Sequence, residues 1–229
     1  GCIPSKALLS VAERMDKIDN SRRRGIKASL DDIDIDRIRS IKERAVITSR
    51  KGIKKQLDEN DIKIIKGEGK IIEEGLVEVE GKKVESDYII IATGSEPTLL
   101  PNIEVDEEKI MTSKSALKLE EVPDSMVIIG GGYIGIELAF VYSSLGTNVT
   151  IVELLDRVIP IMDNDLSEEI EKVLKRKRIK VYTGSKVTNI EGKGPLKVTI
   201  KGETEKEVEE DKVLCSVGRR PKAPECQVK

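Results

Sequence analysis

Residues that could carry chemistry are found at the very start of this 229-residue chain. Cys2 precedes Pro4, which suits the first position of a helix because proline lacks an N–H and its φ is already helical. A thiol at a helix N-terminus meets free backbone N–H groups and the positive end of the helix dipole, and both favour the thiolate. Lys6 follows one turn later on the same face. The pattern predicts a reactive cysteine beside a lysine, with a buried, inert cysteine as the alternative.

A second chemical pattern is the glycine-rich run that begins at Gly130 and fits G-x-G-x-x-G. It follows an apolar strand, opens a helix and precedes another strand that ends in an acid, which is the context a dinucleotide-binding turn requires. Gly130 allows the tight turn, Gly132 lets the backbone approach a pyrophosphate, and Gly135 allows close packing of helix and strand. The pyrophosphate would bind the N–H groups at the helix N-terminus. The predicted dinucleotide contacts are Gly130, Gly131, Gly132, Tyr133, Ile134, Gly135, Ile136 and Glu137.

The acid that ends the second strand is Glu153, 18 positions after Gly135. A carboxylate there can accept hydrogen bonds from both ribose hydroxyls and would repel a 2′-phosphate. The sequence therefore favours NAD over NADP. A glycine-rich turn without any ligand is the alternative.

Composition excludes several classes of function. The 40 basic and 42 acidic residues give a net charge of −2, which argues against nucleic-acid binding. No apolar run approaches the ~20 residues that cross a membrane, and no signal peptide is recognised. The absence of histidine excludes His-based triads and His-containing metal sites, and no CxxC pair suggests a metal. Three cysteines fit a reducing, cytoplasmic setting; Cys215, in an apolar strand, and Cys226 are assigned no role.

Hydrophobic periodicity predicts a mixed α/β protein. Helices are expected at 5–18, 36–58, 114–119, 133–145 and 163–179. Strands are expected at 62–65, 88–92, 126–129, 149–153, 181–182, 187–190, 196–200 and 208–217, with a small antiparallel meander between 71 and 84. The uninterrupted apolar run Tyr88–Ala92 is typical of a strand buried on both faces of a sheet.

The opening hexapeptide Gly-Cys-Ile-Pro-Ser-Lys resembles the active-site segment of the flavin-dependent pyridine nucleotide-disulfide oxidoreductases, and among them the dihydrolipoamide dehydrogenases. In that family a second redox cysteine precedes this segment and would lie before Gly1. The resemblance implies that Cys2 is the flavin-proximal thiol and that Lys6 lies near flavin N5. It also implies that Glu137 pairs with Lys6 and keeps it charged.

Other short motifs follow in the order and spacing of this family. The resemblance implies FAD contacts at Gly69 and at Thr93, Gly94 and Ser95, and NAD contacts at Val187 and Gly218. Tyr133 resembles an aromatic residue that shields the nicotinamide side of the flavin in some members. FAD and NAD are therefore the implied cofactors.

The resemblance divides the chain into four parts. Residues 1–95 are expected to be the later part of an FAD-binding domain, and 96–123 a crossover linker. Residues 124–218 are expected to form a Rossmann-like NAD-binding domain, and 219–229 to begin the return to the FAD domain. The implied fold class is a Rossmann-like domain plus an incomplete FAD-binding domain with the small antiparallel meander.

The implied activity passes electrons from dihydrolipoamide, through a disulfide and FAD, to NAD. Its partner would be the lipoyl domain of a 2-oxoacid dehydrogenase or glycine cleavage complex, and the full-length relative would be a homodimer. The chain without the first FAD motif, the second cysteine and the acid–base histidine of the family is expected to be inactive alone. A mercuric reductase-like member, a non-catalytic NAD-binding module and a structural piece without ligand remain alternatives.

Overall fold

The computed structural model describes residues 1–223, and the chain forms two compact units. The first unit comprises Gly1–Ile47 and Pro97–Gly218, and the second comprises Thr48–Glu96 and Arg219–Lys229. Cys226 lies outside the described residues. The division into domains expected from the sequence stays a prediction.

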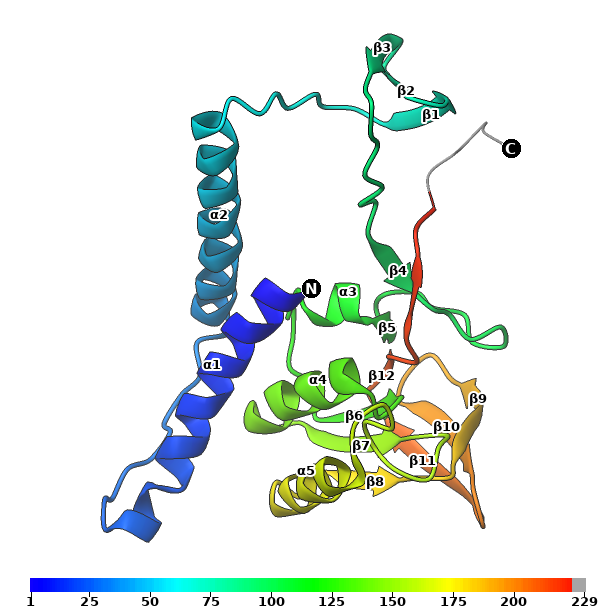
Figure 1. Ribbon diagram of the computed structural model, residues 1–229. Coiled ribbons are helices and arrows are strands. Elements are labelled where there is room, and N and C mark those ends of the chain that lie inside the picture. The colour runs from blue at the N-terminus through cyan, green and yellow to red at the C-terminus, as the bar shows by residue number, and fades with distance from the viewer. Residues whose placement is uncertain (224–229) are drawn as a thin grey trace. The chain divides into compact units, whose positions relative to one another are not determined.

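A five-stranded parallel sheet forms the centre of the first unit (Figure 1). Its order is β5 (Ile110–Thr112), β12 (Lys212–Cys215), β6 (Ser125–Ile129), β7 (Asn148–Val152) and β8 (Lys180–Tyr182). Every neighbouring pair is parallel. Its central strands are almost continuously apolar because both faces of the sheet are covered.

Helices cover one face of this sheet and an antiparallel sheet covers the other. The helical layer contains α1 (Cys2–Asp19), α3 (Ser113–Ala116), α4 (Tyr133–Ser144) and α5 (Asn164–Arg176). The second layer contains β9 (Lys186–Glu191), β10 (Leu196–Lys201) and β11 (Glu205–Glu210). Successive side chains of a strand point to opposite faces. Met126 and Ile128 accordingly join the helical core, and Val127 and Ile129 join the core under the antiparallel sheet.

The second unit contains the expected meander of β1 (Gly69–Glu73), β2 (Leu76–Val79) and β3 (Lys82–Glu85). The helix α2 (Ile35–Glu59) spans the division between the two units, and a short 3₁₀ turn, η1 (Ser21–Arg24), follows α1. The short strands β4 (Ser95–Pro97) and β13 (Arg219–Pro221) pair with each other. Among residues 1–223, no helix is long and apolar enough to span a membrane.

Two strand predictions are wrong. Residues 62–65 and 88–92 form no strand, and Tyr88 and Ile90 are 91% and 90% exposed. The N–H and C=O groups of a buried strand must be paired along its whole length. The described strands pair among themselves and provide no neighbour for the apolar run Tyr88–Ala92. The hydrophobicity of this run is therefore not sufficient to bury it.

Smaller differences have local causes. The expected strand 208–217 is two strands, because it breaks at Asp211, whose carboxylate accepts a hydrogen bond from the N–H of Ser125 at 3.0 Å. The region expected to be only a crossover with a helix at 114–119 also contains β5, an edge strand of the parallel sheet, and its helix is confined to Ser113–Ala116. The other expected helices are confirmed within a few residues.

Candidate functional site

The glycine-rich turn lies where the order of the parallel sheet reverses. The strand β6 leads into the turn, with β12 on one side and β7 on the other. Ligands of open α/β sheets bind at this switch point, beyond the carboxyl ends of the strands.

Three glycines of the turn meet three different needs. Gly130 has φ +105°, and a Cβ there would lie 2.6 Å from the carbonyl oxygen of Ser216. A Cβ on Gly135 would collide with the carbonyl oxygen of Gly130. Gly132 has φ −74°, and no atom lies within 4 Å of the position a Cβ would take. The first two glycines are required by the fold, whereas Gly132 leaves open space in front of the turn.

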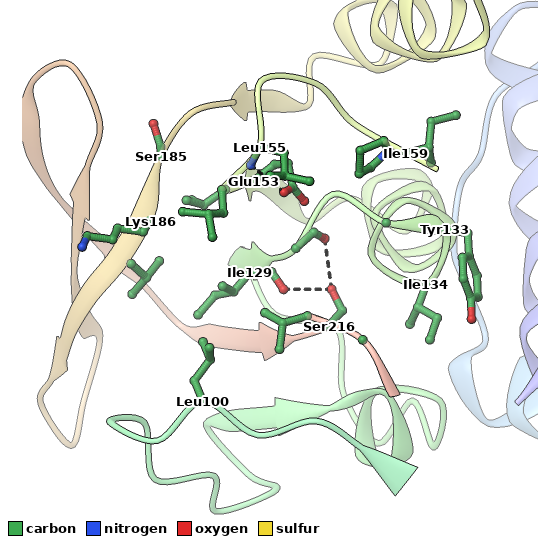
Figure 2. Close-up of a pocket in the computed structure, with 18 of the residues that line it drawn as sticks. Leu100, Ile129, Tyr133, Ile134, Glu153, Leu155, Ile159, Ser185, Lys186 and Ser216 are labelled. Carbon is green, nitrogen blue, oxygen red and sulfur yellow. Dashed lines mark hydrogen bonds between the residues drawn. The ribbon is translucent and has the colours of Figure 1, made fainter. Parts of the chain in front are cut away.

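The open space belongs to a cavity of about 560 Å³ in the first unit (Figure 2). Its wall is mostly apolar, as is usual for a cofactor site. The lining residues are Leu100, Ile129, Gly130, Gly132, Tyr133, Ile134, Val152, Glu153, Leu154, Leu155, Ile159, Pro160, Ile161, Ser185, Lys186, Val187, Ser216, Val217 and Gly218.

The helix α4 begins at this cavity with Gly132 as its N-cap. The first intrahelical hydrogen bond runs from the N–H of Ile136 to the carbonyl of Gly132 at 3.0 Å. The N–H groups of the first turn have no acceptor within the helix, and they carry the positive end of the helix dipole. The helix therefore offers an anion-binding end to the cavity.

Glu153 is buried, with 8% of its surface exposed. One carboxylate oxygen accepts the N–H of Gly131 at 2.6 Å and the other accepts the N–H of Leu155 at 2.8 Å. The sequence predicts that this carboxylate can accept hydrogen bonds from the ribose hydroxyls, and it gave no sign of these two backbone bonds. Each carboxylate oxygen has a second lone pair and can still accept a hydroxyl from the cavity.

Most of the other predicted dinucleotide contacts line the cavity, namely Tyr133, Ile134, Val187 and Gly218. Gly131, Gly135, Ile136 and Glu137 do not line it. The side chain of Ile136 is 4% exposed in the core between α4 and the sheet, and Glu137 contacts α1 instead. The four predicted flavin contacts, Gly69, Thr93, Gly94 and Ser95, belong to the second unit. There the hydroxyl of Thr93 donates to the carbonyl of Lys222 at 2.5 Å.

The N-terminal residues Ser5 and Lys6 contact α4. Lys6 donates a hydrogen bond to one carboxylate oxygen of Glu137, and the hydroxyl of Ser5 donates to the other at 3.0 Å. The hydrogen bond to Glu137 raises the pKa of the Lys6 ammonium above its ordinary value. The sequence predicted the contact between Lys6 and Glu137. The contribution of Ser5, which is 8% exposed, was missed because a lone serine in a helix carries no distinctive signal.

Cys2 is the first residue of α1, with Gly1 as the N-cap, so the helix begins three residues before the expected start at Ser5. Pro4 is then its third residue, where an N–H would still lack an intrahelical acceptor. Cys2 is exposed, whereas Cys215 is buried, and burial raises the pKa of the Cys215 thiol to about 11. Only Cys2 of these two thiols is accessible for chemistry.

A second group of polar contacts holds α1 near its C-terminal end. Asp16 accepts a hydrogen bond from the ammonium of Lys177 at 2.5 Å and another from the hydroxyl of Ser144 at 3.0 Å. Leu8, Ala12 and Met15 are buried between these polar contacts. The described part of the chain contains no cluster of acidic and thiol groups that could hold a metal ion.

Comparisons with known proteins agree with these features. Residues 1–227 match the model of a family described as pyridine nucleotide-disulphide oxidoreductase. The chain is 38% identical to a mitochondrial dihydrolipoyl dehydrogenase of Dictyostelium discoideum, covering 96% of this chain and 48% of the relative. It is 35% identical to a dihydrolipoyl dehydrogenase of Bacillus subtilis, with 97% and 50% covered. It thus spans about half the length of these curated relatives.

Solved structures give the same fold. The HOCl-induced flavoprotein disulfide reductase RclA from Escherichia coli aligns with a TM-score of 0.76 at 25% identity, covering 97% of this chain and 47% of that one. LpdA from Mycobacterium tuberculosis aligns with a TM-score of 0.82 at 24% identity, covering 96% and 50%. With the family model matching nearly the whole sequence, this chain belongs to the pyridine nucleotide-disulphide oxidoreductase family.

Proposed function

We propose that this chain is the NAD-binding and thiol-bearing part of a dihydrolipoamide dehydrogenase, an oxidoreductase that uses FAD and NAD. The observation that carries the proposal is the position of Glu137. It lies two residues after Gly135 in α4, the helix whose N-terminus opens onto the cavity, and it pairs with Lys6, one turn from Cys2. One helix therefore connects a dinucleotide-binding turn with a thiol and a lysine. The reaction would oxidise dihydrolipoamide to lipoamide and reduce NAD⁺ to NADH.

The cavity residues fit NAD. The pyrophosphate would lie on the N–H groups at the start of α4, in the open space beside Gly132. The ribose hydroxyls would donate to the carboxylate oxygens of Glu153, whose orientation is fixed by two backbone N–H groups. A 2′-phosphate would meet a buried negative charge that cannot swing away. We therefore propose NAD rather than NADP as the ligand.

FAD would supply the carrier that accepts two electrons from a dithiol and passes a hydride to NAD⁺. The residues of this chain assigned to that role are Cys2 as the thiol, Lys6 as the cation beside the ring, and Glu137 as the group that orients Lys6. A positive charge held there stabilises the negative charge of a reduced ring. The proposed FAD contacts Gly69, Thr93, Gly94 and Ser95 would act on the nucleotide part.

The assignment of partners and location is also a proposal. Dihydrolipoamide would be presented by a lipoyl domain of a 2-oxoacid dehydrogenase or glycine cleavage complex, and the full-length protein would be a homodimer. Cytoplasmic location is proposed from the three-cysteine composition without a disulfide scaffold. The similarity to the curated dihydrolipoyl dehydrogenases supports the lipoyl partner.

Ligand titration separates this function from that of a structural piece without ligand. The fluorescence of NADH is measured while the purified chain is added, and the titration is repeated with NADPH as a competitor. Lipoamide and FAD are then added to test for turnover. We expect saturable NADH binding, NADPH binding weaker by about tenfold or more, and no turnover by this chain alone. Absence of NADH binding would refute the proposed function. Lipoamide-dependent turnover would refute the inactivity of the chain.

A further inference from the structure

A single peptide unit of the glycine-rich turn, the one joining Gly130 and Gly131, is held at both of its polar atoms. Its carbonyl oxygen accepts a hydrogen bond from the hydroxyl of Ser216 at 3.1 Å. Its N–H donates to the carboxylate of Glu153 at 2.6 Å. Figure 2 shows the Ser216 hydroxyl between the carbonyls of Ile129 and the turn. Its single hydrogen is shared between the two carbonyl oxygens, and the distance to that of Ile129 is 3.0 Å.

The two holding residues come from strands on either side of β6. Cys215 of β12, Ile129 of β6 and Val152 of β7 lie side by side in the register of the parallel sheet. The next residue of each strand is therefore placed at the same carboxyl edge. These residues are Ser216, Gly130 and Glu153. The two hydrogen bonds that hold the Gly130–Gly131 peptide, here called the clamp, therefore follow from the register of the sheet.

Such a clamp is needed because the peptide lies between two glycines. Neither glycine has a Cβ, so rotation of the peptide plane meets little steric resistance. In the observed orientation the carbonyl faces Gly135 and the Ser216 hydroxyl. Rotation would turn the carbonyl oxygen, which is the negative end of the peptide dipole, away from Gly135 and Ser216. This change would occur at the N-terminus of α4, where an anion would bind. It would also remove the N–H of Gly131 from the buried carboxylate of Glu153, which then loses one of its two donors.

We propose that Ser216 is a positioning residue for dinucleotide binding, whose hydroxyl acts with the Glu153 carboxylate to fix the Gly130–Gly131 peptide. The fixed peptide keeps the N-terminal N–H groups of α4 directed at a diphosphate. Ser216 itself is 9% exposed and needs no contact with the ligand. This inference rests on the proposed dinucleotide-binding function.

The experiment compares Ser216→Ala with Ser216→Thr, which keeps the hydroxyl, and with Ser21→Ala as a matched control. Ser21 is also 9% exposed, and its hydroxyl also donates to a backbone carbonyl, that of Ile26 at 3.1 Å. Three quantities are measured for each chain: the Kd for NADH, the amide NMR shift of Gly131, and the Tm.

We expect Ser216→Ala to raise the Kd for NADH about five- to tenfold, as loss of one hydrogen bond predicts, and to displace the Gly131 amide signal. Ser216→Thr should keep the Kd for NADH and the Gly131 amide signal at the values of the unmodified chain. Ser21→Ala should change only the Tm. A purely structural serine would lower the Tm in Ser216→Ala without moving the Kd or the Gly131 signal, and that result would overturn the proposal.

Failure of the proposed function gives a different result. If the unmodified chain binds no NADH, that function is refuted, and the Gly131 signal alone decides the clamp. A displaced signal in Ser216→Ala then supports the clamp, and an unchanged signal refutes it.

Discussion

Glu137 is the residue at which the chemical groups of the first unit meet. One of its oxygens pairs with Lys6 and the other accepts the hydroxyl of Ser5 at 3.0 Å. Two consecutive residues of α1 thus fix both oxygens of one carboxylate on α4. The arrangement leaves the lysine charged and oriented while the thiol of Cys2 stays accessible at the start of the same helix.

Replacement of Glu137 by glutamine should lower the pKa of Lys6 toward 10.5, because the hydrogen bond to the carboxylate is the main cause that raises it. A raised pKa in the folded state stabilises the protein while Lys6 is charged. The stabilisation is complete below the unfolded pKa and is lost as the pH rises through the folded value. NMR titration of the Lys6 side chain measures the shift.

The same variant gives a stability test. The Tm difference between the unmodified chain and Glu137→Gln should be constant from neutral pH up to about 10 and should shrink above it. A difference that persists unchanged through the titration of Lys6 would show that the pair contributes nothing to stability.

At the scale of elements, polar contacts hold α1 at two places, one near its start and one near its end. The first is the contact of Lys6 and Ser5 with Glu137, and the second is the contact of Asp16 with Lys177 and Ser144. Apolar residues of α1 lie between them in the helical core. Two polar anchors with an apolar stretch between them fix the register of one helix on the other.

The second anchor should contribute measurably to stability, because its side chains are only 20% and 33% exposed. Asp16→Asn should lower stability by about 1 kcal/mol, which corresponds to a Tm decrease of roughly 2–4 °C for a protein of this size. Glu169→Gln is the control, since the Lys172–Glu169 pair is 59% and 63% exposed and should change the Tm little. Equal decreases in both variants would contradict the anchoring role of Asp16.

The sequence predicted those elements whose signals are local. The strand before Gly130, the turn and the strand ending at Glu153 each carry a periodic pattern or a glycine requirement that one segment reveals. The hydroxyl of Ser216 was not predicted, because its meaning depends on the register of β12 against β6. The strand 88–92 was predicted wrongly, since its hydrophobicity says nothing about whether a neighbouring strand is present.

At the scale of the whole molecule, the two units differ in how their apolar residues are used. The first unit packs the apolar residues of its parallel sheet into two cores on opposite faces of that sheet. In the second unit the run around Tyr88 and Ile90 is exposed, although it has the composition of an interior strand. The chain also spans about half the length of its curated relatives.

An exposed apolar run favours association between chains. We expect the purified chain to self-associate with rising concentration in sedimentation velocity, and Tyr88→Lys with Ile90→Lys to reduce it. The NADH affinity should not change. Ile26→Lys is the control, because Ile26 is 59% exposed outside this run. Association that is insensitive to the double substitution but reduced by Ile26→Lys would contradict the role of this run in association.

The most direct test of the account is the Kd for NADH of the chain with Gly132→Ala, measured beside its Tm. The backbone of Gly132 has a negative φ and nothing lies within 4 Å of the added methyl group, so the fold should tolerate alanine with little change in Tm. The methyl group would occupy the space proposed for the pyrophosphate, and the affinity should fall by about tenfold or more. An unchanged Tm with an unchanged Kd would place the dinucleotide elsewhere and contradict the site.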